Sequence, residues 1–77
     1  KGSLVTVLAN EPGSLAEITK IISTNNGNIS NIQVISRDID FYKFNIDLEI
    51  KNINHLNQII AAMRLSQFVE NVERGKD

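Results

Sequence analysis

Residues 42 to 50 alternate without interruption between apolar and polar side chains, and this pattern constrains the fold more than any other feature. The apolar positions are Tyr42, Phe44, Ile46, Leu48 and Ile50, and the residues between them are Lys43, Asn45, Asp47 and Glu49. A period of two places alternate side chains on opposite faces of a β-strand. One face of this strand is therefore expected to be buried, while the other faces water or a partner.

Other segments predict the remaining strands of the sheet. Residues 4–9, 29–37 and 68–74 are short runs rich in β-branched and apolar residues, bounded by turn-forming residues. Asp38-Ile39-Asp40 separates two of the strand-like runs and predicts a hairpin turn.

Two helices are also predicted. Ser14 and Glu17 have the S-x-x-E spacing of a capping box, so a helix should begin there, and Gly27 should end it in the left-handed conformation. An apolar stripe at positions i, i+3, i+4 and i+7 predicts a second helix, formed by Leu56, Ile59, Ile60 and Met63. Asn52 or Asn54 is expected to cap that helix.

The predicted order β-α-β-β-α-β belongs to the α+β class and indicates a ferredoxin-like sandwich. Right-handed crossovers place both helices on one face of a four-stranded antiparallel sheet. We expect Val5, Val7 and Val34 to face the helices. On the opposite, open face we expect Leu4, Leu8 and Ile35, and apolar residues exposed there would suggest an interface.

A chain of 77 residues forms one small domain, residues 1–77, with a modest core. It has no Cys, so disulfides and Cys-based zinc sites are excluded, and the single His55 cannot form a metal site alone. We expect His55 to be exposed. Because the small core is not reinforced by disulfides or a metal, we expect a domain cut from a larger protein. It would be stabilised by the rest of that protein or by a second copy.

Charge and composition argue against several functions. The net charge is −1, and the eight basic residues are scattered, whereas autonomous nucleic-acid binding needs a clustered basic face. No apolar run is long enough to span a membrane. Asp38 and Asp40 are expected in a solvated turn, and Ser14 has no histidine to activate it. We therefore expect no enzyme activity, no metal and no cofactor.

The segment from Asn10 to Leu15 is the best candidate for binding. Pro12 restricts the turn, and Gly13 removes a side chain where backbone N–H groups open a helix, a position that suits a carboxylate. Asn10 offers both a donor and an acceptor to an α-amino or carboxylate group. The alternative is a well-formed turn and helix start with no ligand.

This turn, together with Gly27, Asn28 and Ile29, resembles the ACT domain over nearly the whole chain. The resemblance implies a regulatory module that binds an amino acid at an interface between domains. Its ligand site would consist of Asn10, Glu11, Pro12, Gly13, Ser14 and Leu15, with Asn28 and Ile29 from a neighbouring copy. Glu11 departs from the arginine found in many members, which removes a cation that could hold a carboxylate.

Later segments are similar to the C-terminal ACT domain of the Rel/Spo stringent-response enzymes, notably Asn28–Ile32, Ile46–Ile50 and Val69–Arg74. That resemblance implies a bacterial, cytoplasmic parent that makes and hydrolyses guanosine tetra- and pentaphosphate, with the catalytic domains elsewhere in the chain. A homodimer is expected. The competing hypothesis is a ligand-free module that docks on other domains of the parent, on a second copy, or on ribosome-bound tRNA.

Overall fold

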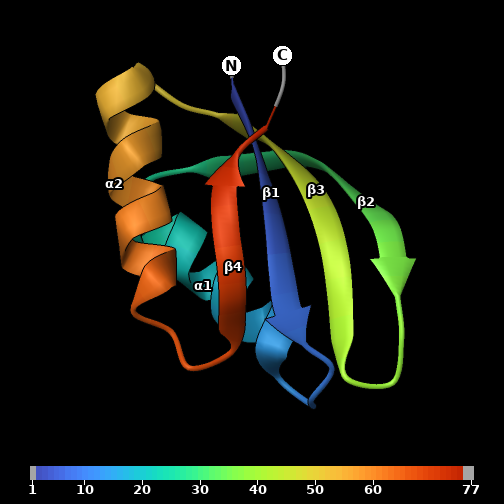
Figure 1. Ribbon diagram of the computed structural model, residues 1–77. Coiled ribbons are helices and arrows are strands. Elements are labelled where there is room, and N and C mark those ends of the chain that lie inside the picture. The colour runs from blue at the N-terminus through green and yellow to red at the C-terminus, as the bar shows by residue number, and fades with distance from the viewer. Residues whose placement is uncertain (1, 76–77) are drawn as a thin grey trace.

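The computed structural model describes residues 2–75, and its elements follow the predicted order (Figure 1). They are β1 (Gly2–Ala9), α1 (Ser14–Thr24), β2 (Asn28–Arg37), β3 (Phe41–Glu49), α2 (Ile53–Arg64) and β4 (Val69–Arg74). The strands form one sheet in the order β2-β3-β1-β4, and every neighbouring pair is antiparallel. The predicted ferredoxin-like fold is confirmed.

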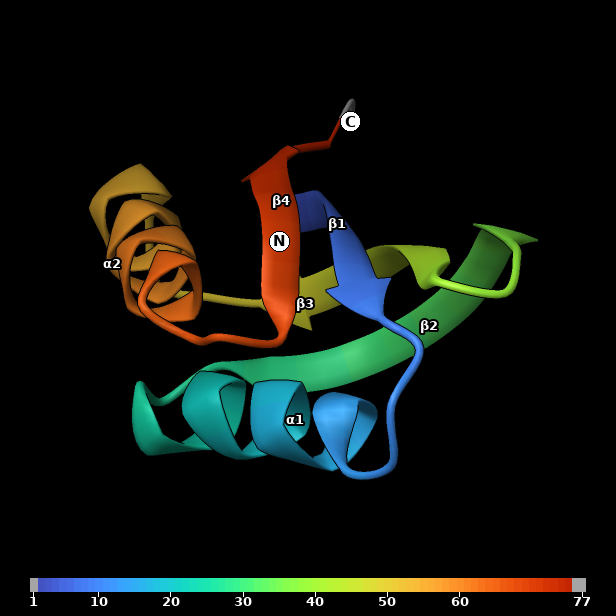
Figure 2. The same ribbon diagram turned by 60° about the horizontal axis from the view of Figure 1, so that its bottom comes forward.

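The helices form a second layer against the sheet (Figure 2). α2 packs on β4 and β1, α1 packs on β2 and β1, and the two helices contact each other. The alternation along β3 has the predicted sense, because Phe44, Ile46 and Leu48 are buried while Lys43 and Glu49 are exposed. Within residues 2–75, neither helix is long and apolar enough to cross a membrane.

The predicted face of β1 is wrong. Leu4, Thr6 and Leu8 are fully buried in the core, whereas Val5 and Val7 are only partly buried. The cause is the register with β3, in which Leu4 lies opposite Ile46. Residues directly opposite each other in an antiparallel pair point to the same face, so the buried face of β3 dictates that of β1. Leu4 and Leu8 therefore belong to the core and do not form an interface.

A register shift in β4 explains its irregular pattern. Val72 lies opposite Thr6, but the pairing shifts between Val7 and Leu8, so Val69 comes opposite Leu8. The extra residue changes the parity of the strand, as in a β-bulge. Both valines can therefore pack against the core although they are three positions apart.

The end of α1 differs in detail from the prediction. Asn26, with a φ of 66°, adopts the left-handed conformation that we expected for Gly27. The N–H of Gly27 donates to the Ile22 carbonyl (2.9 Å) and that of Asn26 to the Ser23 carbonyl (3.0 Å), which is a Schellman ending. Gly27 serves close packing instead, since a Cβ there would lie 2.8 Å from Cδ1 of Ile59.

β2 forms one edge of the sheet and buries little. Val34 lies opposite Phe44, on the predicted face, yet it is 53% exposed, and its neighbour Ile35 is 51% exposed. The pairing with β3 shifts at two places, between Ile29 and Asn31 and again between Val34 and Ser36. This strand therefore has a free edge with apolar side chains that the core does not cover.

Candidate functional site

The turn between β1 and α1 is held by its own backbone. The N–H of Glu11 donates to the Ala9 carbonyl (2.9 Å), and the N–H of Ser14 donates to the Glu11 carbonyl (3.2 Å). Gly13 has a φ of 86°, which L-residues with a side chain rarely adopt. A Cβ on Gly13 would meet nothing within 4 Å, so glycine is needed for the backbone conformation and not for space.

The predicted capping box is wrong. Gly13 is the N-cap residue, and Ser14 is the first residue of the helix, with a side chain only 8% exposed. The Gly13 carbonyl accepts from the N–H of Glu17 (2.9 Å), so the helix starts one residue earlier than expected. The N–H groups of Leu15 and Ala16 lie in the first turn, where the helix itself provides no acceptor.

Asn10 connects this turn to the β2–β3 hairpin. Its side-chain amide donates to the carbonyls of Ile39 (3.1 Å) and Asp38 (3.4 Å), and its backbone N–H donates to the Asp40 carbonyl (2.8 Å). The Asp38 carboxylate in turn accepts from the backbone N–H groups of Asp40 (2.9 Å) and Phe41 (2.7 Å). The donor that we expected to bind a ligand is therefore used to join two loops.

The two parts of the predicted ligand site lie far apart in one chain. Residues 10–13 precede α1 and Asn28 follows it, so the 11 residues of the helix separate them by about 16 Å at 1.5 Å per residue. Figure 1 shows the turn and the start of β2 near opposite ends of α1. Asn28 donates from its side chain to Oε1 of Glu49 (3.1 Å). A single copy cannot bring both parts to one small ligand.

Apolar side chains are exposed at the end of the molecule that carries the turn. They belong to α1, to the end of β2 and to the hairpin, namely Leu15 (39% exposed), Val34, Ile35, Ile39 (88%) and Phe41 (38%). Asn10 holds the hairpin beside the turn, as described above. Ile35 is thus exposed as predicted, although its predicted companions Leu4 and Leu8 are not.

The acidic side chains of the open sheet face are held by amides. The Asp47 carboxylate accepts from the side chains of Asn45 (3.2 Å) and Asn31 (3.5 Å). Within residues 2–75, the His, Asp and Glu side chains form no group that could hold a metal ion. Asp38 and Asp40 are both exposed at the hairpin, as expected for a solvated turn.

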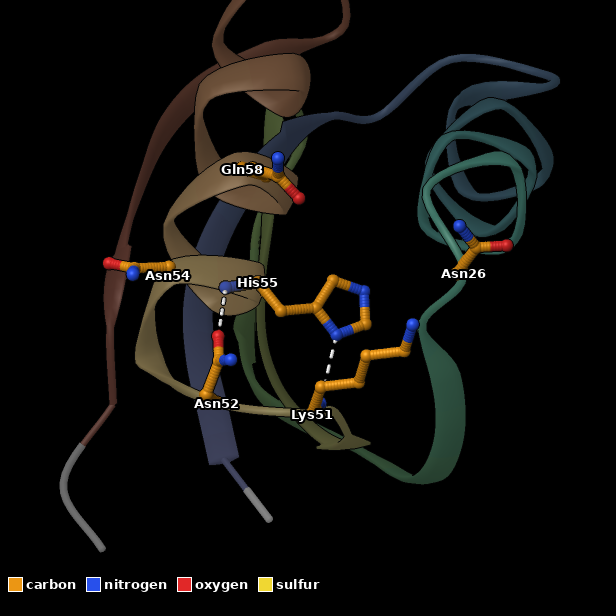
Figure 3. Close-up of a pocket in the computed structure, with 6 residues that line it drawn as sticks. All are labelled: Asn26, Lys51, Asn52, Asn54, His55 and Gln58. Atoms are coloured by element: carbon orange, nitrogen blue, oxygen red, sulfur yellow. Dashed lines mark hydrogen bonds between the residues drawn. The ribbon is translucent and has the colours of Figure 1, made fainter.

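A polar pocket of about 270 Å³ lies at the opposite end of the molecule, between α1 and α2 (Figure 3). Its lining residues are Asn26, Lys51, Asn52, Asn54, His55 and Gln58. Asn52 caps α2 as predicted, because its side-chain oxygen accepts from the N–H of His55 (2.9 Å).

His55 is buried, at 7% exposure, so the prediction of an exposed side chain is wrong. Nδ1 lies 2.9 Å from the backbone nitrogen of Lys51, and Nε2 lies 2.7 Å from the carbonyl oxygen of Asn25. Asn25 is 30 positions away in the sequence, so no local signal could have identified this contact.

Comparison with known proteins agrees with the resemblance of the sequence. The family model for the ACT domain matches residues 2–74. Curated proteins called GTP pyrophosphokinase rsh, from Brucella ovis and Brucella melitensis, are 40% identical to this chain over 65 residues. The match covers 84% of this chain but 9% of each relative, so the chain spans a small part of the length of these enzymes.

Comparison with solved structures also identifies an ACT domain. The crystal structure of the ACT domain from the GTP pyrophosphokinase of Chlorobium tepidum has a TM-score of 0.80 and 27% identity, covering 96% of this chain and 95% of that chain. The ligand-free regulatory subunit of aspartate kinase from Thermus thermophilus has a TM-score of 0.72 with 8% identity, covering 100% of this chain and 52% of that chain. At that identity, the second likeness concerns the fold alone.

Proposed function

Because this chain belongs to the ACT domain family, we propose that it is the regulatory domain of a larger Rel/Spo-type GTP pyrophosphokinase and senses an amino acid for that enzyme. The parent would make and hydrolyse guanosine tetra- and pentaphosphate in the bacterial cytoplasm, through catalytic domains outside this segment. The 40% identity to the Brucella enzymes supports this assignment of the parent. The domain itself would bind and transmit, without catalysing a reaction.

The exposed start of α1 supports an amino-acid site. Gly13 presents no side chain there, and the N–H groups of Leu15 and Ala16 point out of a helix whose dipole is positive at this end. A ligand carboxylate would accept from these donors, and the exposed Leu15 would contact an apolar ligand side chain. The proposed site comprises the segment 10–15.

The second part of the site would come from another copy. Two-fold antiparallel pairing of two β2 edges would place the beginning of one β2 beside the end of its partner's β2. The β1–α1 turn lies at the end where β2 finishes, since Asn10 bonds the hairpin after it. Asn28 and Ile29 of one copy would thereby approach residues 10–15 of the other. The separation of the two parts by α1 favours such a shared site, with the ligand stabilising the dimer.

An amide NMR titration of the 77-residue chain with Val, Ile, Leu and Ser tests this proposal. At millimolar ligand the titration detects binding as weak as about −4 kcal/mol. We expect chemical-shift changes at the amides of both Gly13 and Asn28, and weaker ligand binding in the Leu15→Ala variant. Ile53→Ala is the matched control, because Ile53 is also a half-exposed apolar residue in the first turn of a helix. A dimeric sample without shifts at either segment would refute ligand sensing.

A ligand-free docking function is the second candidate, and the uncovered apolar residues of the β2 edge favour it. Ile35 is half-exposed on an edge strand, where backbone groups are available for pairing. Under this proposal, Ile35→Lys should abolish self-association or docking of the full-length parent, measured by sedimentation velocity. Ser36→Lys adds the same charge at the next, exposed position and should have a smaller effect. Equal effects of the two variants would exclude Ile35 as an anchor.

A further inference from the structure

We infer that His55 is a positioning residue that ties the α1–β2 connection to the start of α2, and that it does so only while its ring is uncharged. Such a link goes beyond the proposed sensing function, because it operates whether or not a ligand binds. It would make the geometry at one end of the domain respond to pH. Three hydrogen bonds of His55 and the charges around its ring support this inference.

Both ring nitrogens of His55 are occupied by backbone groups with opposite requirements. The N–H of Lys51 points at Nδ1 (2.9 Å), so Nδ1 must act as an acceptor and carry no proton. The proton of the neutral ring must then lie on Nε2, which donates to the carbonyl oxygen of Asn25 (2.7 Å). The backbone on both sides of the ring therefore selects one neutral tautomer. Figure 3 shows the ring projecting from α2 towards the α1–β2 connection, beside Lys51.

A second proton would break this arrangement. It would have to go on Nδ1, where it would oppose the N–H of Lys51 and leave that donor without its acceptor. His55 is 7% exposed, so water would reach the new charge only in part. The N-cap bond from the N–H of His55 to Asn52 involves the backbone, and it does not depend on the protonation of the ring.

The charges that face the ring do not favour a cation. Lys51 is the charged residue among those lining the pocket, and it is positive. The other lining residues are Asn26 at the end of α1, and Asn52, Asn54 and Gln58 at the start of α2, and all of them carry uncharged amides. A charged ring would therefore meet one cation and no carboxylate among these lining residues.

The consequence reaches the proposed ligand site. Asn25, which accepts from Nε2, ends α1, and the connection runs on through Gly27 to Asn28. Gly27 is packed closely against Ile22 and Ile59, so the connection has little freedom while the His55 link is intact. Loss of the link would loosen the segment that presents Asn28 and Ile29. This step depends on the proposed site, whereas the link itself does not.

NMR of the unmodified 77-residue chain tests the link without any substitution. A long-range ¹H–¹⁵N spectrum of the imidazole at about pH 8 should show the Nε2–H tautomer. On titration to about pH 5, the range in which histidine side chains change charge, amide exchange of Lys51, corrected for its intrinsic pH dependence, should accelerate. We expect acceleration of about three- to tenfold, the equivalent of one ordinary hydrogen bond. The amides of residues 25–28 should shift with the same midpoint as the ring.

Several results would overturn the inference. These are an Nδ1–H tautomer, a ring that stays neutral throughout the titration, or protection of Lys51 that does not change when the ring titrates. His55→Gln should abolish the shared midpoint. A His55→Gln/Asn54→His double variant moves the titratable ring to the adjacent, exposed position and serves as the control. If that control keeps the pH response of Lys51, a ring in the buried position is not its cause.

Discussion

Truncation of Leu8 is the most direct test of which face of β1 is buried. The sequence pattern predicted this side chain on the open face of the sheet, whereas the structure places it in the core. Leu8 is fully buried (0% exposed) and lies opposite Tyr42 on one side and Val69 on the other. Leu8→Ala should lower the free energy of unfolding by about 2–5 kcal/mol, the range for buried leucines. A domain of this size has a total stability of about 4–12 kcal/mol, so the loss is a large fraction of it.

Val7→Ala is the matched control on the open face of the same strand. Val7 is only partly buried, so truncation should cost about 1 kcal/mol or less, mainly through β-propensity. Urea unfolding followed by circular dichroism gives both values, provided that the m-value stays constant. If Val7→Ala proved as destabilising as Leu8→Ala, the assignment of the two faces would be wrong.

Three further expectations concern backbone positions and can be checked by the same unfolding experiment. Gly13→Ala should destabilise by about 1–2 kcal/mol through left-handed strain alone, and Gly13→Asn by less; no loss in the alanine variant would contradict the φ of 86°. Gly27→Ala should cost about 1–3 kcal/mol through overpacking, and Ile59→Val in the same chain should recover part of it, because the two side chains would clash. Asn52→Ala should cost about 1 kcal/mol through loss of the cap of α2. Asn54→Ala, which changes an exposed residue two positions later, should have almost no effect.

The confirmed predictions concern short segments in which apolar and polar residues are clearly separated onto two faces. In β3 every polar residue alternates with an apolar one, so burial follows from the pattern, and Phe44, Ile46 and Leu48 are buried as expected. The stripe on α2 is equally unambiguous, and Leu56, Ile59, Ile60 and Met63 all lie in the core. In both cases one face is apolar and the other is polar, which leaves a single stable orientation.

The wrong predictions come from segments whose sequence is compatible with two arrangements. Both faces of β1 carry apolar residues, so its alternation is compatible with either orientation, and only pairing with β3 selects one. In the β1–α1 turn, Gly13 and Ser14 can both begin a helix, and the backbone of the preceding turn decided between them. At the end of α1, Asn26 and Gly27 can both adopt the left-handed conformation. In the structure Asn26 adopts it, and Gly27 instead allows close packing against Ile59.

The sequence by itself determined the order of elements, the fold class, the buried face of β3 and α2, and the likeness to a regulatory domain family. Tertiary structure alone decided where the side chains of the candidate sites point. Asn10 bonds a carbonyl 29 positions away, and His55 bonds one 30 positions away. Periodicity reports the environment of a residue averaged along its own element, whereas such contacts depend on which distant backbone groups the packing brings within hydrogen-bonding distance. Local patterns therefore predicted the framework of this domain, and long-range packing determined how its candidate sites are built.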